Sequence, residues 1–266
     1  MMENFPSAAS QGRAHLASRS SEGQQDFQRY EFKYLLNARL REGIETEVRH
    51  FMRYDGHVHR SLENAYIVRS LYFDDPYSSA FYEKIDGIME RQKFRLRTYG
   101  SDWEPSLPIF LETKGRTNER TYKHRIAVRY EHLDLLTTPS QCWKLVDSYK
   151  QSALVEKFIY DTDRRNISAR VLVDYLRRPY VSDYDSNFRV TFDHAVKSCV
   201  AKSLYPPEGS VNWKECVAGW TILEVKFDRR MPKWFHRILQ NFELRRVSIS
   251  KFCLGMKQCG IAEDLS

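Results

Sequence analysis

The stretch RQKFRLRTY (91–99) decides the fold, because basic and apolar residues alternate along it. Alternate side chains of a β-strand share a face. Four cations would therefore lie on one face of this strand: Arg91, Lys93, Arg95 and Arg97. Phe94 and Leu96 would lie on the opposite face. The stretch thus predicts a strand with one apolar face, which packs on a core, and one strongly basic face.

Short strands are also expected on both sides of this stretch. Seven further stretches are rich in β-branched and aromatic residues and often alternate in polarity: 29–36, 65–75, 108–115, 120–128, 169–181, 187–193 and 221–228. The few residues between 115 and 120 permit a hairpin but no parallel crossover. We therefore expect a mainly antiparallel sheet of about eight strands, which could close into a barrel.

Helical patterns fall between the strands, at 38–52, 77–86, 132–160 and 232–243. Pro139 stands inside the third and is expected to split it. If the sheet closes with its charged face inward, its apolar face points outward and the helices cover it. The pattern therefore predicts an α+β fold with helices packed on the outside of the sheet.

Most of the other strands also gather their charged residues on one face. The charged residues that share a parity within their strands are Arg29, Glu31, Lys33, Glu112, Lys114, Lys123, Arg125, Arg189, Asp193, Glu224 and Lys226. A solvated face explains any single strand, but so many adjacent cations are costly unless an anion neutralises them. Arg and Lys are the residues that hold phosphate. The stretch 169–181 fits least well and requires a bulge or a change of face, because Val171 and Val173 share the parity of Arg177.

The charge balance and the absence of certain motifs limit the classes of binding partner. Lys and Arg number 42 against 35 Asp and Glu, a net charge of +7, which favours an anionic partner. No apolar run approaches a membrane span, and no nucleic-acid motif, zinc spacing, P-loop or Ser–His–Asp signature is present. We expect a cytoplasmic protein that binds no nucleic acid. Residues 1–27 are expected to form a disordered tail, because they are rich in small and polar residues.

Several short motifs follow one another in an order that resembles a known family. They are RYEFKYLL (29–36), SLYFDD (70–75), KFRLRTYG (93–100), FLETKG (110–115), YKHRIAV (122–128), FRVTFD (188–193), LEVKF (223–227) and SISKFCLGM (248–256). In this order they resemble the VTC domain, one of the triphosphate tunnel metalloenzymes. The resemblance implies a closed eight-stranded β-barrel with a charged lumen over residues 28–260, followed by a short tail at 261–266.

The resemblance also implies roles for individual residues. Five match catalytic positions: Arg95, Arg97, Lys114, Glu224 and Lys251. Six match positions that bind substrate: Lys33, Lys123, Arg125, Arg177, Arg189 and Lys226. Glu224 matches the metal-binding glutamate, with Glu31 and Glu112 as further candidates for holding Mn²⁺ or Mg²⁺.

The implied activity is that of a polyphosphate polymerase, which transfers the terminal phosphoryl group of ATP to a growing phosphate chain. Two alternatives stay open: a triphosphate or polyphosphate hydrolase in the same tunnel, and a protein that binds polyphosphate or nucleotide without catalysis. Related hydrolases open with E-x-E-x-K, but the first position here is Arg29, ahead of Glu31 and Lys33. That departure favours the polymerase branch.

Overall fold

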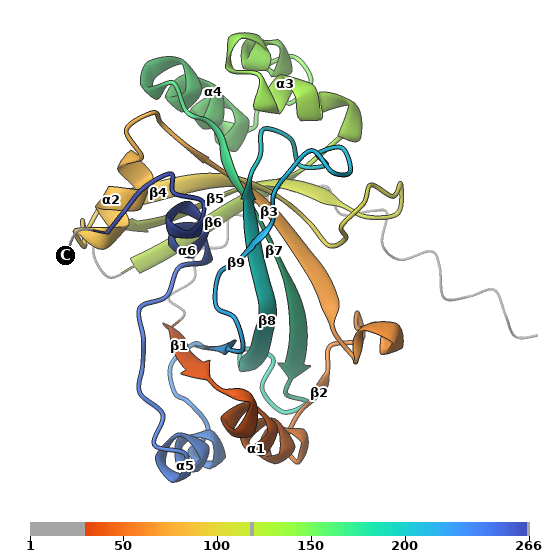
Figure 1. Cartoon of the computed structure of the whole chain (residues 1–266), viewed down its shortest axis with the longest axis vertical. Coiled ribbons are helices and arrows are strands. Elements are labelled where there is room, and N and C mark those ends of the chain that lie inside the picture. The colour runs from red at the N-terminus through yellow and green to blue at the C-terminus, as the bar shows by residue number, and fades with distance from the viewer. Residues whose placement is uncertain (1–29, 118–119, 265–266) are drawn as a thin grey trace, which may run out of the picture.

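The structure is a computed structural model, and it describes residues 30–117 and 120–264. Its centre is one antiparallel sheet (Figure 1). Eight strands follow one another across it, in the order β1 (Tyr30–Leu36), β10 (Thr221–Phe227), β8 (Arg189–Val200), β7 (Ser168–Val181), β3 (Tyr66–Asp74), β4 (Arg91–Thr98), β5 (Ile109–Thr117) and β6 (Arg120–Val128). Two short strands lie off this path: β2 (Arg53–Tyr54) beside β7, and β9 (Lys214–Glu215) beside β8. The expected antiparallel α+β fold is confirmed; the expected N-terminal tail lies outside the described residues.

The helices lie close to their expected positions, with one addition. They are α1 (Ala38–Arg49), α2 (Ser79–Ile85), α3 (Leu133–Thr137), α4 (Ala153–Arg165), α5 (Lys233–Asn241) and α6 (Lys251–Gln258). Three 3-10 turns are η1 (Arg60–Leu62), η2 (Tyr130–His132) and η3 (Pro139–Leu145). Pro139 begins η3 and so splits the helical region as predicted. Helix α6 was not predicted; Ser250 caps it by accepting from the backbone N–H of Cys253.

The predicted closure of the barrel is wrong. The sheet curls strongly, but within the described residues no ladder joins its end strands, β1 and β6 (Figure 1). The chain after α5 lies along the free edge of β1 instead. There the backbone N–H of Val247 donates to the carbonyl of Lys33 at 2.9 Å. An ion pair between side chains spans the opening, where Lys114 Nζ of β5 lies 2.9 Å from Glu31 Oε2 of β1. The sheet is an open, curled half-barrel.

The outer face of the sheet is apolar and lies under helices, as predicted. At one end Phe94 and Leu96 are buried together with Phe158 of α4. Phe94 and Phe158 meet edge to face, with ring centroids 5.3 Å apart. At the other end Val190 and Val225 are buried beneath α1 and α5. Because these faces are fixed by packing, the charged residues of the same strands must point to the concave side.

Helix α6 packs on the concave side, against β7 and β8 (Figure 1). A Cβ at Gly255 would lie 3.0 Å from a methyl of Val173 and 3.1 Å from one of Val171, tighter than ordinary contact, so glycine lets the helix approach this closely without displacing the valines. The stretch 169–181 therefore needs no change of face, since its inward valines are covered by a helix. The stretch does contain a bulge, at Arg170, because Val171 and Ala169 pair with the consecutive residues Tyr72 and Phe73 of β3. A second irregularity lies in β8 at Ala195, whose φ is +49°.

Candidate active site

The charged face of the sheet forms a concave surface that we call the basin. Its lysines and arginines are Lys33, Lys93, Arg95, Arg97, Lys114, Lys123, Arg125, Arg177, Arg189, Lys226 and, from α6, Lys251. Its carboxylates are Glu31, Glu112, Asp193 and Glu224. Cations thus outnumber carboxylates, and the contacts divide into one group around Glu224 and another around Glu112.

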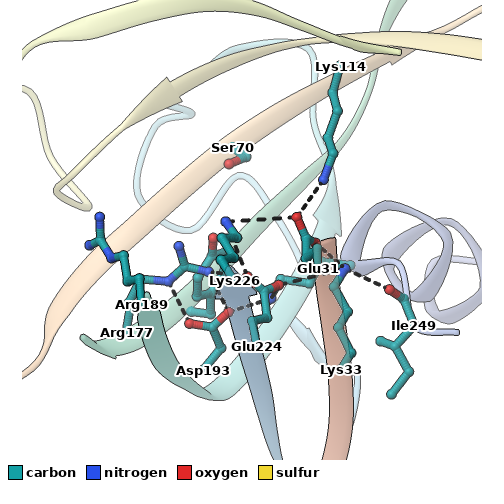
Figure 2. Close-up of polar contacts among 12 residues, drawn as sticks. Glu31, Lys33, Ser70, Lys114, Arg177, Arg189, Asp193, Glu224, Lys226 and Ile249 are labelled. Carbon is teal, nitrogen blue, oxygen red and sulfur yellow. Dashed lines mark hydrogen bonds and ion pairs between the residues drawn. The ribbon is translucent and has the colours of Figure 1, made fainter. Parts of the chain in front are cut away.

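Glu224 is the centre of the first group (Figure 2). Arg177 donates to Asp193 through Nε and Nη2, both at 2.7 Å, and its Nη2 also reaches Glu224 Oε2 at 3.0 Å. From α6, Lys251 donates to Glu224 Oε1 at 2.9 Å and lies 2.5 Å from Asp193 Oδ2. Three strands and the helix thereby meet at two buried carboxylates.

Glu31 links this group to the opening of the sheet (Figure 2). Lys33 Nζ lies 3.1 Å from Glu31 Oε1 and 3.7 Å from Glu224 Oε1, and it donates to the carbonyl of Ile249 at 3.0 Å. Lys226 Nζ lies 3.9 Å from both Glu31 Oε2 and Glu224 Oε2. Each carboxylate is therefore shared among several cations.

These contacts keep the carboxylates charged. Burial alone would raise the pKa of Glu224, but the surrounding cations, Lys251 foremost, hold it well below its usual range. Burial also opposes ionisation of Glu31, yet Lys114 and Lys33 lower its pKa. The group is therefore an ionised network at neutral pH.

Glu112 is the centre of the second group and is only 1% exposed. Arg95 donates to Glu112 Oε2 through Nε at 2.8 Å, and Lys123 Nζ lies 2.7 Å from Oε1. Burial would raise the pKa of Glu112, but Arg95, Arg97 and Lys123 together outweigh it and the pKa falls. This single carboxylate holds two cations of the basin in place.

Arg97 and Lys93 have no such partner. Arg97 is 8% exposed, and its hydrogen bonds go to two hydroxyls, Ser70 Oγ at 3.1 Å and Tyr175 OH at 3.3 Å. Lys93 donates to Ser250 Oγ at 3.3 Å. Within residues 30–117 and 120–264, neither forms an ion pair with a carboxylate. Arg97 is buried and Lys93 is half-buried. A cation that is withdrawn from water without a counterion is costly, so these two residues call for an anion from outside the chain.

The pKa of Tyr72 indicates the electrostatic potential inside the basin. It is 3% exposed, and Arg95 Nη1 donates to its hydroxyl at 3.2 Å. Burial would raise the pKa of this phenol, yet Arg95, Arg97 and Lys93 lower it to about 8. Cations that overcome burial in this way make the basin strongly electropositive.

The family comparison identifies the domain. The family model described as VTC domain matches residues 28–259. The chain belongs to the VTC domain family. None of the curated proteins matches it.

Two solved structures resemble this VTC domain over most of its length. One, described as a "putative adenylate cyclase" from Bacillus halodurans, shares 11% identity at a TM-score of 0.46, and the match covers 83% of this chain and 92% of that one. The other, a protein of Pyrococcus horikoshii OT3, shares 14% identity at a TM-score of 0.41, covering 86% and 97%.

Two of the predicted site residues lie at the margins of the basin. Arg125 is exposed and stacks on the ring of Phe110, with its guanidinium carbon 4.8 Å from the ring centroid. Arg189 is held by Asp55 at 2.7 Å, a residue that follows β2. Arg97 lies between the hydroxyls of Ser70 and Tyr175. The remaining predicted residues of the VTC domain meet in the two groups around Glu224 and Glu112.

Several residues that shape the site were given no role in it by the sequence analysis. Asp193 is fully buried and orients both Arg177 and Lys251. Its parity with Arg189 in FRVTFD placed it on the charged face, which is a signal that could have found it. Lys93 carried the same signal within RQKFRLRTY. Tyr72 carried none, because an inward tyrosine is indistinguishable from core in a sequence.

The carboxylates fit a metal ion only if the substrate supplies most of its ligands. Within the described part of the chain, no three His, Cys, Asp or Glu side chains are grouped to hold an ion. Mg²⁺ commonly takes one or two carboxylates and completes its shell with phosphate oxygens and water. Glu224 and Glu31, which share Lys33 and Lys226 as neighbours, could provide such a pair. Glu112 stands apart from this pair, because its ion-pair partners are Arg95 and Lys123, which belong to the other group.

Within the described ranges, none of the helices of the VTC domain combines the length and the apolar character that crossing a bilayer requires.

Proposed function

We propose that this VTC domain binds the triphosphate of ATP in its basin and transfers the terminal phosphoryl group to a phosphate chain. The observation that carries this proposal is a pair of cations, Arg97 and Lys93, that form no ion pair with the described part of the chain and lie among further lysines and arginines. A triphosphate supplies several negative charges in a row, and guanidinium and ammonium groups bind such charges with strong hydrogen bonds. Membership of the VTC family supports the same class of substrate.

For phosphoryl transfer the protein must hold the two phosphate groups in line and neutralise their negative charge. A terminal oxygen of the acceptor chain forms a bond to the γ-phosphorus of ATP, the bond from that phosphorus to the bridging oxygen breaks, and ADP leaves with the electron pair. Arg95, Arg97 and Lys114 would hold the phosphates, while Lys251 would face the acceptor. No protein nucleophile is required, because the acceptor oxygen is already charged.

A divalent ion, Mn²⁺ or Mg²⁺, would be held by Glu224 with Glu31 and would offset negative charge on the phosphates. The chain's own contribution is to keep both carboxylates ionised, which the low pKa values of Glu224 and Glu31 ensure.

Product analysis tests the proposal. Purified protein is incubated with ATP and Mn²⁺, and phosphate chains, orthophosphate, ADP and unchanged ATP are separated. We expect ADP together with phosphate chains longer than three units. ADP with orthophosphate alone would instead identify a hydrolase, and unchanged ATP with every divalent ion tried would identify a protein that binds phosphate without catalysis.

A further inference from the structure

A second basic site lies where the basin meets α2. A pocket of about 340 Å³ is lined by Lys84, Ile85, Gly87, Met89, Arg91, Arg116 and Ser248. Three of these residues are cations and none is a carboxylate. No residue of this pocket belongs to the groups around Glu224 and Glu112.

The pocket continues the charged face of two basin strands. Arg91 lies two residues before Lys93 on β4, and Arg116 lies two residues after Lys114 on β5, so all four share the concave face. Arg91 and Arg116 are direct cross-strand partners, and so are Lys93 and Lys114. Like charges placed directly opposite each other destabilise a sheet. Glu31 compensates Lys114 in the inner pair, whereas Arg91 and Arg116 face each other at a pocket whose lining holds no carboxylate. An anion bound there would relieve their repulsion.

The segment between α5 and α6 also connects the pocket with the basin. Ser248 Oγ accepts from Lys84 Nζ at 3.0 Å in the pocket. One residue later the carbonyl of Ile249 accepts from Lys33, and Ser250 Oγ accepts from Lys93. These consecutive residues therefore border the pocket on one side and the basin on the other.

We propose that the pocket of Lys84, Arg91 and Arg116 is a subsite for the outer phosphates of a linear polyphosphate whose inner end occupies the basin. The proposal rests on the proposed function, since it assigns that chain to the basin. Its consequence is selectivity for length: a long chain contacts both basin and pocket, whereas tripolyphosphate fills the basin alone. None of the residues that line the pocket is a carboxylate, so the pocket would take phosphate without a metal ligand in its lining.

The test compares two ligands on one variant. Tripolyphosphate and a linear polyphosphate several times longer are titrated calorimetrically, without metal, into wild type and the double variant Lys84→Ala, Arg91→Ala. We expect the affinity of the double variant for the long chain to fall about tenfold or more, because two charge-assisted contacts are lost. Its affinity for tripolyphosphate should change less than about twofold. The slope of log Kd against log salt for the long chain should fall by about one for each cation removed.

Two further variants serve as controls for the assignment of the pocket. Arg237→Ala removes an exposed arginine of α5, which lies on the outer face, and should change neither affinity. Lys84→Glu alone keeps Arg91 and should weaken the long chain selectively if the double variant fails to fold.

The outcomes separate the subsite from the function it rests on. Equal losses for both ligands, or no loss for either, would overturn the subsite while leaving the basin intact. Failure of wild type to bind either ligand would overturn the proposed function and the subsite with it. A single-stranded oligonucleotide of matching charge is the last arm; binding as tight as that of the long phosphate chain would show a general polyanion surface and overturn the assignment to polyphosphate.

Discussion

Glu224→Gln is expected to lower turnover of ATP by about a hundredfold or more, while tripolyphosphate still binds in metal-free buffer. The substitution keeps the shape of the side chain and removes the charge that a divalent ion requires. Its neighbours Lys251 and Arg177 then lose one carboxylate, so the positive potential of the basin rises. Binding of the triphosphate without metal should therefore stay constant or become tighter. Steady-state rates and calorimetry on the same preparation measure the two effects.

The matched control is Glu47→Gln, an exposed carboxylate of α1 on the outer side of the sheet. It should change neither turnover nor binding. Unchanged turnover in Glu224→Gln would refute the metal-holding role of Glu224. A loss of both turnover and binding would instead show that Glu224 acts by organising the basin cations.

Arg97→Met is expected to weaken tripolyphosphate binding by about ten- to a hundredfold and to raise the melting temperature of the ligand-free protein. The two effects have one cause. Arg97 is buried against the hydroxyls of Ser70 and Tyr175 and forms no ion pair with a carboxylate of the described residues. Its charge is therefore expected to destabilise the free fold and to become favourable when an anion binds. Methionine fills similar space without a charge. Calorimetry gives the affinity, and thermal unfolding with and without ligand gives the stability.

Arg69→Met is the contrasting variant. Arg69 lies on the outer side of β3 and makes two hydrogen bonds to Asp174, at 2.9 Å and 2.7 Å. Removing it leaves a buried carboxylate unpaired, which should lower the unfolding free energy by about 3–5 kcal/mol. The opposite result for Arg97→Met would be a lower melting temperature, as expected for Arg69→Met. That result would contradict the claim that the charge of Arg97 destabilises the ligand-free protein and serves to bind an anion.

Alternation along the strands was sufficient to predict which side chains lie in the basin. Phe94 and Leu96 lie under α4 as predicted, and Val190 and Val225 lie under α1 and α5. The reason is physical: the apolar face of each strand must pack on the core, and this fixes the side to which its charged face points. The same rule placed the predicted cations and carboxylates on one concave surface.

Features that depend on contacts between distant segments were not predictable in this way. The closed barrel failed because the edge of β1 bonds to Val247, more than two hundred residues away along the chain. Helix α6 was missed because it is short and apolar on most sides, and its packing on Val171 and Val173 made that strand look irregular. The pairing of Arg177 with Asp193 likewise follows from strand register, which no single stretch encodes.

Titration of Tyr72 is the measurement that tests the central claim most directly, because the phenol lies inside the basin beside Arg95. The protein is labelled with ¹³C at the tyrosine Cζ, the Tyr72 signal is assigned from the Tyr72→Phe variant, and its pKa is measured with and without saturating tripolyphosphate. In the free protein the pKa should be about 8, because the cations of the basin stabilise the phenolate. Bound phosphate neutralises those cations, so the pKa should rise above its ordinary value, as burial alone would dictate. A Tyr72 pKa that does not change on addition of tripolyphosphate would contradict the claim that phosphate chains bind in the basin.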